Sequence, residues 1–394
     1  MRINKQRILL ILIITFCFNL IISCDSKPQQ DINKKQPKKD TLTVIHLSFT
    51  GDLMCHQPQF EAASTGDGHY NFLPFFSEVK KYLEKPDIMF GNFETVTAGK
   101  EEKFTGYPAF NSPDEYIKDL KNAGFKFLFT ANNHCFDRNE KGVLKTIKNI
   151  EDNGLLHSGT SKSQEDRDSV KIFMVKGIKI SVLAYTYGIN GKSIPSNKKY
   201  LVNFIDAETI KKDISNARNA GAEIIIVYFH YGEEYQREPN SYEKNIVDKT
   251  VEYGADIVIG GHPHVLQPAD FFTSSTSKID TVFVAYSTGN FITNQKGRYK
   301  DAGVIINVEI SKNLNTGKIN LGKTSFIPVW IFKGTSKNQK YIIFPSEIAY
   351  GKNLPGFLSN RDISDMKQSY DDTESIMTKY SDRIKVESIL VNEK

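Results

Sequence analysis

The sequence is poor in cysteine, has a single tryptophan and shows no internal repeat. Two of its four cysteines, Cys17 and Cys24, lie close to the amino terminus, so Cys55 and Cys135 remain for the rest of the chain. Two thiols cannot build a disulfide framework, which excludes a small disulfide-stabilised fold. We expect both to pack as small buried side chains. Contact with each other or with a metal ion is the open alternative, because both lie beside the polar motifs described below.

Net charge is also absent beyond the amino-terminal segment. Of the formal charge of +5, three units come from Arg2, Lys5 and Arg7 and two from residues 24–40, so residues 41–394 are formally neutral. Nucleic-acid-binding domains carry a basic face that meets the phosphate backbone. The neutral remainder therefore predicts no nucleic-acid partner.

A targeting segment opens the chain. The apolar run Ile8–Ile22 follows basic residues and is short for a helix that spans a bilayer. It leads into Ser23-Cys24, an arrangement that resembles a bacterial lipobox. We expect a lipoprotein signal peptide over residues 1–23 and a lipid on Cys24 that anchors the protein on the extracytoplasmic side of the cell envelope. An ordinary signal peptide or an uncleaved anchor is the alternative interpretation.

Three regions are expected after the signal peptide. Residues 24–40 are rich in Lys, Gln, Asp and Pro and nearly lack apolar side chains, which predicts a flexible tether. Residues 41–335 form the predicted folded domain. Residues 336–394 are expected to form a C-terminal extension, packed on the domain or trailing from it, with a charged helical stretch after Asn360.

Up to Gly261, predicted strands alternate with predicted helices, which favours a layered α/β fold. The expected strands are 41–50, 87–90, 125–131, 171–175, 179–185, 223–229 and 256–260. The expected helices are 72–83, 113–123, 140–153, 207–220 and 242–253, with Asp206 as a cap of the fourth. After Gly261, strands 281–287, 303–310 and 318–326 follow one another without helices, so this half is expected to be antiparallel.

Short polar motifs stand where five of these strands end. They are Gly51-Asp52, Gly91-Asn92-Phe93-Glu94, Asn132-Asn133-His134, the run from His230 to Tyr235, and Gly261-His262-Pro263-His264. In an open α/β sheet, ligands bind at the carboxyl ends of the strands. Taken singly, an Asp after a strand is usually a cap or turn residue, and a lone His at a strand end is more often a structural residue than a ligand. Taken together, the carboxylates, amides and imidazoles suit first-row divalent metals and predict a two-metal hydrolytic centre.

The order and context of these motifs resemble the metal-binding series of the calcineurin-like phosphoesterase superfamily. A closer similarity is to the CapA family, the capsule or poly-γ-glutamate synthesis proteins of bacteria. This similarity rests on the motifs above together with Val265-Leu266-Gln267-Pro268 and Tyr286-Ser287-Thr288-Gly289-Asn290-Phe291. The resemblance covers residues 42–329 and implies a four-layer αββα sandwich with mixed parallel and antiparallel sheets.

The resemblance also implies roles for individual residues. One metal ion would be held by Asp52 and His264, the other by Asn133, His230 and His262, and Glu94 would bridge them. His134 would be the acid that protonates a leaving group or steadies the transition state. The tentative substrate contacts are Asn92, Asn132, Glu234 and Asn290. The cofactor would be two divalent transition-metal ions, Mn, Fe or Zn.

Two positions depart from the broader superfamily pattern. Met54 stands where that pattern has a ligand histidine, and His56 is a candidate substitute. Glu94 stands where the bridging residue is aspartate, which lengthens the reach by one methylene. Both departures also look like the CapA pattern itself, so they argue against ordinary phosphatase activity rather than against the family.

Two functions compete. The first is a surface-anchored metalloenzyme that acts on an anionic envelope polymer, capsule or poly-γ-glutamate, or on its precursor, at a phosphoester or a γ-glutamyl amide. The second is a non-catalytic accessory lipoprotein that tethers polymer for a membrane synthase complex. Met54 favours the second, whereas His134 favours catalysis, because a purely structural metal site does not use an unligated acid. A metal-dependent phosphoesterase is the third interpretation.

Overall fold

The computed structural model describes residues 41–334 and 340–390. The predicted signal peptide 1–23, Cys24 and the tether 24–40 lie outside the described residues, and so do 335–339 and 391–394. Within the described part of the chain, no helix combines the length and the apolar character needed to cross a bilayer.

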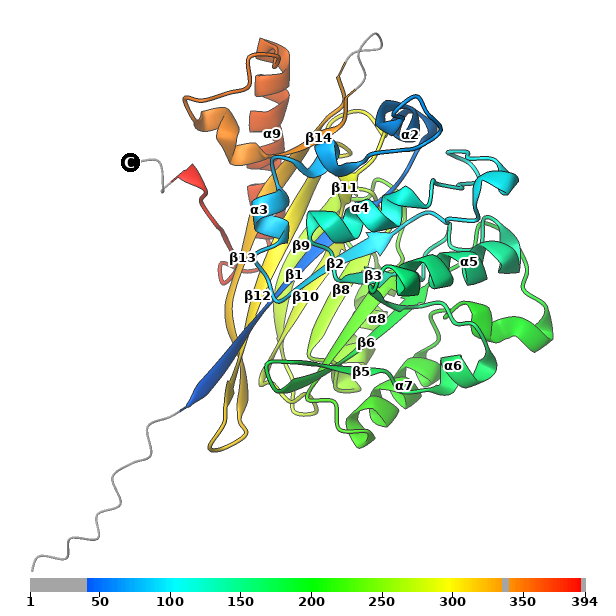
Figure 1. Ribbon diagram of the computed structural model, residues 1–394. Coiled ribbons are helices and arrows are strands. Elements are labelled where there is room, and N and C mark those ends of the chain that lie inside the picture. Colours follow the sequence, from blue (N-terminus) through cyan, green and yellow to red (C-terminus); the bar gives the residue numbers. More distant parts are fainter. Residues whose placement is uncertain (1–40, 335–339, 391–394) are drawn as a thin grey trace, which may run out of the picture. The chain divides into compact units, whose positions relative to one another are not determined.

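Two β-sheets form the centre of the folded part (Figure 1). The first has the strand order β14-β13-β12-β1-β2-β3-β4, with β11 beside β1 and β15 beside β13. Its strands are β1 (Leu42–Leu53), β2 (Ile88–Phe93), β3 (Phe127–Phe129), β4 (Leu156–Ser158), β11 (Asn290–Ile292), β12 (Ala302–Asn313), β13 (Ile319–Phe332), β14 (Ile342–Pro345) and β15 (Lys385–Val386). The second has the order β5-β6-β7-β8-β10-β9. Its strands are β5 (Ile172–Val175), β6 (Ile178–Thr186), β7 (Ile224–His230), β8 (Ile257–Gly261), β9 (Leu266–Thr273) and β10 (Thr281–Thr288).

Parallel and antiparallel pairs occupy different parts of each sheet. The strands β1 to β4 are parallel neighbours in the first sheet, and β6, β7, β8 and β10 are parallel neighbours in the second. Antiparallel pairs join β1, β12, β13 and β14, and also β10 with β9 and β5 with β6. The predicted mixed sheets are therefore confirmed. The strand β10 departs from the expected antiparallel half, because it lies parallel to β8.

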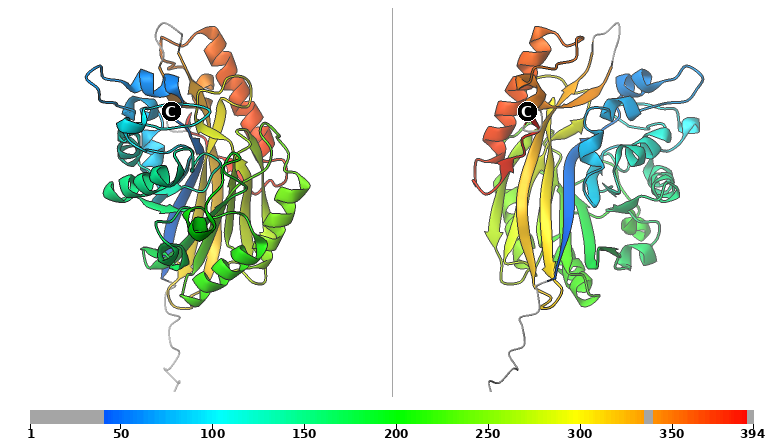
Figure 2. Two further views of the ribbon diagram at one scale, coloured as in Figure 1. Left: turned by 90° about the vertical axis from the view of Figure 1, so that its right-hand side faces the viewer. Right: turned by 60° about the vertical axis from the view of Figure 1, so that its left-hand side comes forward.

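Helices cover the outer faces of both sheets (Figure 2). Those beside the first sheet are α2 (Gln57–Ala63), α3 (Lys80–Leu83), α4 (Glu115–Ala123) and α5 (Asn139–Asp152), and those on the second are α7 (Ala207–Asn219) and α8 (Ser241–Glu252). The short α6 (Gln164–Asp168) follows β4. The C-terminal helix α9 (Asn360–Met377) contacts β13 and β9, one strand from each sheet.

Separate hydrophobic cores hold the layers together. The core between the sheets contains Phe90 of β2 and Ile226 of β7, both completely buried. A second core packs Leu120 of α4 against the outer face of the first sheet. A third packs Val247 of α8 and its neighbours against the second sheet. Central strands such as β2, β7 and β8 are buried along their whole length, because layers pack on both of their faces, and the predicted four-layer αββα sandwich is confirmed.

Some predicted elements differ from those observed. The expected helix 72–83 consists of a 3-10 turn η1 (Leu73–Phe76) and the short α3, with Pro74 in the first turn of η1. The strand β9 was not predicted, and Pro268 lies within it. A proline is tolerated there because β9 is the edge strand of the second sheet, and the N–H groups along its outer edge have no neighbouring strand to pair with. The cap at Asp206 is confirmed, since its carboxylate accepts the Thr209 N–H at 2.8 Å.

Candidate metal centre

The predicted metal ligands converge at one edge of the two sheets. Asp52 lies near the end of β1, Glu94 follows β2, Asn133 follows β3, His230 ends β7, and His262 and His264 follow β8. The strands within each sheet that deliver them are parallel, so their carboxyl ends meet at the same edge. All six side chains are buried.

Direct contacts join these side chains in pairs. Asp52 Oδ2 lies 2.9 Å from His264 Nδ1, and Asn133 Oδ1 lies 3.0 Å from His230 Nε2. Glu94 lies between the pairs, because its Oε1 is 3.6 Å from His264 Nε2 and 3.8 Å from His230 Nε2. The pairs are those that the family resemblance gives to the two ions.

Two groups of three residues are compact enough to hold an ion. One contains Glu94, His262 and His264, and the other contains Asp52, Glu94 and His230, with the ligand atoms of each group within 4.8 Å of one another. Glu94 belongs to both groups. A shared carboxylate is the feature that a bridging ligand requires, although the division of the remaining ligands between ions stays a prediction.

The chemistry of the cluster fits divalent metal ions. Oε1 of Glu94 and Nδ1 of His262 are buried and have no hydrogen-bond partner among the described residues. Burial and the neighbouring Asp52 carboxylate raise the pKa of Glu94 well above its ordinary value. Burial and neighbouring imidazoles lower the pKa of His230 strongly and that of His262 to about 3. The imidazoles are therefore neutral, with lone pairs available for a cation that would also offset the carboxylates.

The backbone conformation just after the carboxyl end of β8 indicates that function constrains these residues. His262 and His264 have φ angles of 96° and 56°, in the region that favours glycine. Such conformations are costly for side-chain-bearing residues and concentrate at functional sites. Here they turn two imidazoles in succession toward Glu94.

The two predicted substrate contacts Asn92 and Asn132 are completely buried and lie among the candidate ligands. The Asn92 amide donates to Asp52 Oδ1 at 2.7 Å and to Glu94 Oε2 at 3.1 Å. Asn132 donates to Asn92 Oδ1 at 3.2 Å and so fixes the orientation of that amide. The observed contacts orient both carboxylates, and contact with a substrate stays a prediction.

The other two predicted substrate contacts differ in exposure. Glu234 is exposed and lies near enough to contribute to the raised pKa of Glu94. Asn290 is completely buried. Its amide donates to the carbonyl oxygens of His264 at 3.0 Å and Lys300 at 2.9 Å, so it ties the loop after β11 to the end of β8.

The structure adds Asp137, which the sequence analysis missed. Its Oδ2 lies 2.8 Å from His134 Nδ1 and also accepts the Phe110 N–H at 2.7 Å. The Phe110 ring packs edge-on against the His134 imidazole with 4.6 Å between ring centroids. The available signal was the spacing His134-Cys135-Phe136-Asp137, which returns the carboxylate to the imidazole within one turn. His134 belongs to neither group of candidate ligands.

The remaining candidates lie beside the centre without joining it. Cys55 and Cys135 are free and buried, and burial raises the pKa of each thiol to about 12, so they behave as small core residues. His56 directs Nδ1 to Gln59 Oε1 at 3.0 Å and belongs to neither group of candidate ligands. Met54 is buried, with its sulfur near the hydroxyl of Thr293.

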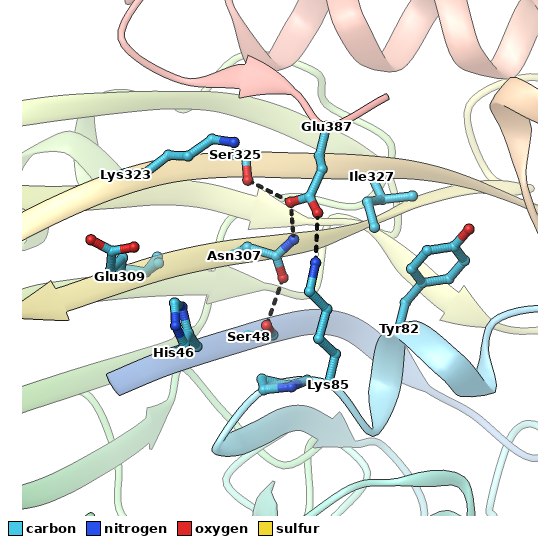
Figure 3. Close-up of a pocket in the computed structure, with 12 residues that line it drawn as sticks. His46, Ser48, Tyr82, Lys85, Asn307, Glu309, Lys323, Ser325, Ile327 and Glu387 are labelled. Atoms are coloured by element: carbon cyan, nitrogen blue, oxygen red, sulfur yellow. Dashed lines mark hydrogen bonds and ion pairs between the residues drawn. The ribbon is translucent and has the colours of Figure 1, made fainter. Parts of the chain in front are cut away.

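A cavity of about 200 Å³ lies along β1, β12 and β13, away from these ligands (Figure 3). Five of its polar side chains, Ser48, Lys85, Asn307, Ser325 and Glu387, form one hydrogen-bonded network. Glu387 accepts hydrogen bonds from Lys85 at 3.0 Å, Asn307 at 2.9 Å and Ser325 at 2.9 Å. This network fastens the segment around β15 to the first sheet, which is a structural role.

An αββα sandwich with buried carboxylates and imidazoles at the ends of its parallel strands defines an α/β protein with a candidate metal centre. The chain belongs to the family described as bacterial capsule synthesis protein PGA_cap, whose model matches residues 46–295. The resemblance inferred from the motifs is thereby confirmed.

Two relatives carry the CapA name. The capsule biosynthesis protein CapA of Bacillus anthracis is 28% identical over 282 residues, which are 70% of this chain and 65% of that protein. The chain thus matches just under two thirds of the length of that relative. The PGA biosynthesis protein CapA of Bacillus subtilis strain 168 is 29% identical over 318 residues, 78% of this chain and 79% of that protein.

Solved structures with a related architecture are more distant. The NAD nucleotidase of Haemophilus influenzae gives a TM-score of 0.43 at 14% identity, covering 88% of this chain and 57% of that one. The calcineurin-like phosphoesterase YfkN of Bacillus subtilis gives 0.42 at 14% identity, covering 84% and 98%. Likenesses at this level support no statement about activity.

Proposed function

We propose that this protein is a metal-dependent enzyme of the bacterial cell envelope that hydrolyses or transfers a bond in a capsule polymer, poly-γ-glutamate or a precursor of either. The observation that carries the proposal is that Glu94 belongs to both compact groups of candidate ligands, while the nearby His134 belongs to neither. The polymer class is supported by the names of the two Bacillus relatives, which refer to capsule and PGA biosynthesis.

We propose two divalent ions, Mn, Fe or Zn, as the cofactor. Asp52 and His264 would hold one ion, Asn133, His230 and His262 the other, and Glu94 would contact both. Divalent ions in such a site supply Lewis-acid character toward the reacting group. The rest of the chemistry falls to the side chains around them.

His134 is the proposed proton donor. His134 Nδ1–H donates a hydrogen bond to Asp137 Oδ2, which fixes the orientation of the ring and leaves Nε2 for the substrate. The His134 backbone N–H donates to Asn132 Oδ1 at 3.2 Å, and Phe110 packs against the ring, so the imidazole is held on several sides. As an imidazolium, whose charge the Asp137 carboxylate would balance, the ring would give the proton on Nε2 to the leaving atom of a phosphoester or a γ-glutamyl amide and keep the proton on Nδ1.

The test of catalysis is a His134→Ala variant of the full chain, purified in detergent and loaded with Mn or Zn. We expect wild-type metal content by elemental mass spectrometry and a fall in turnover of on the order of 100-fold to 10,000-fold. The assay would use a generic phosphodiester and a γ-glutamyl peptide in parallel, so that the active substrate identifies the electrophile. Unchanged turnover in the variant would remove His134 from the mechanism.

The proposed location is the extracytoplasmic face of a membrane, with the lipid on Cys24 as the anchor and a membrane polymer synthase complex as the partner. We expect Cys24→Ala to move most of the protein from the membrane to the soluble fraction, because a single lost lipidated residue removes both acyl anchors. Fractionation and mass spectrometry of the amino-terminal peptide measure this. Unchanged membrane association would favour an uncleaved apolar anchor over residues 8–22.

A non-catalytic accessory lipoprotein is the second candidate, favoured by Met54 at a position where the broader superfamily has a histidine ligand. In that case the centre would bind at most a structural ion and the protein would hold polymer for the synthase. Metal-loaded protein that turns over neither substrate and binds polymer would support it.

A further inference from the structure

Three exposed tyrosines surround the candidate metal centre. Tyr107, Tyr187 and Tyr235 are 73%, 45% and 47% exposed. Their ring centroids lie 6.4 Å from that of His134, 4.6 Å from that of His262 and 6.4 Å from that of His264, respectively. Three loops, each far from the others in sequence, thus place an exposed aromatic ring beside a different histidine of the site. Burial in a core does not explain them, because each exposes a large part of its surface.

The backbone that carries two of these rings is fixed to the strand ends. The Tyr187 N–H donates to the His230 carbonyl at 3.0 Å, and the Tyr235 N–H donates to the Pro263 carbonyl at 2.7 Å. Tyr235 also has a φ of 68°, which is unfavourable for a residue with a side chain. The rings are therefore held in position before any ligand arrives, which reduces the entropy that binding must offset.

The hydroxyl groups of Tyr187 and Tyr235 have polar neighbours at the site. The side chain of Tyr187 hydrogen-bonds Asn133, a candidate metal ligand. Burial, the bond to Glu234 and the nearby Tyr107 raise the pKa of Tyr235 to about 12, so its hydroxyl keeps its proton at neutral pH. Each ring thus offers a flat apolar face and a polar edge.

The charges around the rim are of both signs. Lys300 places Nζ 5.0 Å from the centroid of the Tyr235 ring. Glu233 and Glu234, both exposed, stand directly before Tyr235 in the same loop. A polymer with a carboxylate on every unit would meet these two glutamates as well as the lysine, and like charges are costly at a binding surface. A chain of polar rings with widely spaced acidic groups avoids that repulsion.

We propose that Tyr107, Tyr187 and Tyr235 form a saccharide-binding rim that presents an acidic glycan chain to the candidate metal centre, with Lys300 contacting its acidic groups. This inference rests on the proposed function and narrows its substrate from envelope polymers in general to glycans. The flat face of a tyrosine packs against the C–H face of a pyranose ring, and its hydroxyl bonds the ring substituents. Poly-γ-glutamate has no such ring.

The test is calorimetric titration of the full chain in detergent, with and without Mn, using a hyaluronan hexamer, which has a carboxylate on every second ring, a γ-linked glutamate hexamer and 5′-AMP as probes. We expect the hyaluronan hexamer to bind most tightly. Tyr187→Ala and Tyr235→Ala should each weaken that binding about tenfold, the loss of one aromatic contact. Tyr350→Ala is the matched control, because Tyr350 is equally exposed at 48% and lies in the segment before α9. It should bind as the wild type does.

Several outcomes would overturn the rim. The first is that the glutamate hexamer binds more tightly than the saccharide hexamer. The second is that the saccharide binds equally to the wild type and to both tyrosine variants. The third is that AMP binds most tightly and that its binding depends on the same tyrosines. The metal measurement separates this inference from the proposed function. Tyrosine-dependent saccharide binding by a protein that takes up no metal would contradict the proposed metalloenzyme and support the saccharide-binding rim. Metal uptake without saccharide binding would contradict the rim and remain consistent with the metalloenzyme.

Discussion

Glu94→Gln is expected to lower the affinity for divalent metal by more than about 100-fold and to raise the thermal stability of the metal-free protein. Loss of a residue that only supports a metal ligand lowers metal affinity about 10-fold to 100-fold, and loss of a direct ligand lowers it further. Glu94 is the residue shared by both groups of candidate ligands, so both ions should be affected. The readout is metal per chain by elemental mass spectrometry after dialysis against a limiting metal concentration.

The gain in stability has a separate cause. Without metal, Glu94 is a completely buried carboxylate with an unpaired Oε1, and the Asp52 carboxylate raises its pKa. The amide of Gln keeps the bond from Asn92 at one end and can donate toward His230 or His264 at the other. Removing the charge should then add about 1–3 kcal/mol to the free energy of unfolding. Calorimetry in the presence of chelator measures this.

Two further variants set the limits of this prediction. His262→Ala should also lower metal content, because His262 belongs to one of the two groups. His134→Ala should keep the metal, because His134 belongs to neither. Equal metal content in all three variants would contradict the assignment of the centre.

The ligands could be predicted from the sequence because each stands where a strand ends. The parallel order of the strands brings Asp52, Glu94 and Asn133 to one edge of the first sheet and His230, His262 and His264 to one edge of the second. The packing of the two sheets then places these edges together. The layers could be predicted for a similar reason. Strands that are apolar throughout, such as β2 and β7, require cover on both faces.

The surroundings of the ligands could not be predicted in this way. Tyr107, Tyr187 and Asp137 lie in loops, and their positions follow from individual backbone turns rather than from a repeating pattern. Asn290 shows the converse, because a polar residue in a site motif uses its amide to hold His264 and Lys300 in place. The sequence therefore indicates which residues reach the site, whereas the partner of each side chain is known only from the structure.

Gly51→Ala is expected to reduce the free energy of unfolding by at least about 3 kcal/mol or to prevent folding. A Cβ at position 51 would lie 1.8 Å from the carbonyl oxygen of Gly289 and 2.7 Å from that of Thr288. Both obstacles are backbone atoms, so no side-chain rearrangement can relieve the overlap. Denaturant unfolding and the yield of soluble protein measure the effect, with Gly356→Ala as the control, because a Cβ at Gly356 meets nothing within 4 Å.

The size of this effect follows from what crosses at Gly51. The strand β10 of the second sheet ends at Thr288, and the chain passes over Gly51 before β11 pairs with β1 in the first sheet. The Asp52 N–H donates to the Gly289 carbonyl at 2.9 Å at this crossing. The two sheets are thus joined beside Asp52, and a separation of the crossing strands would also move Asp52 from His264. A Gly51→Ala variant with wild-type stability and metal content would show that the sheets can part here without cost, and that the crossing does not hold the centre together.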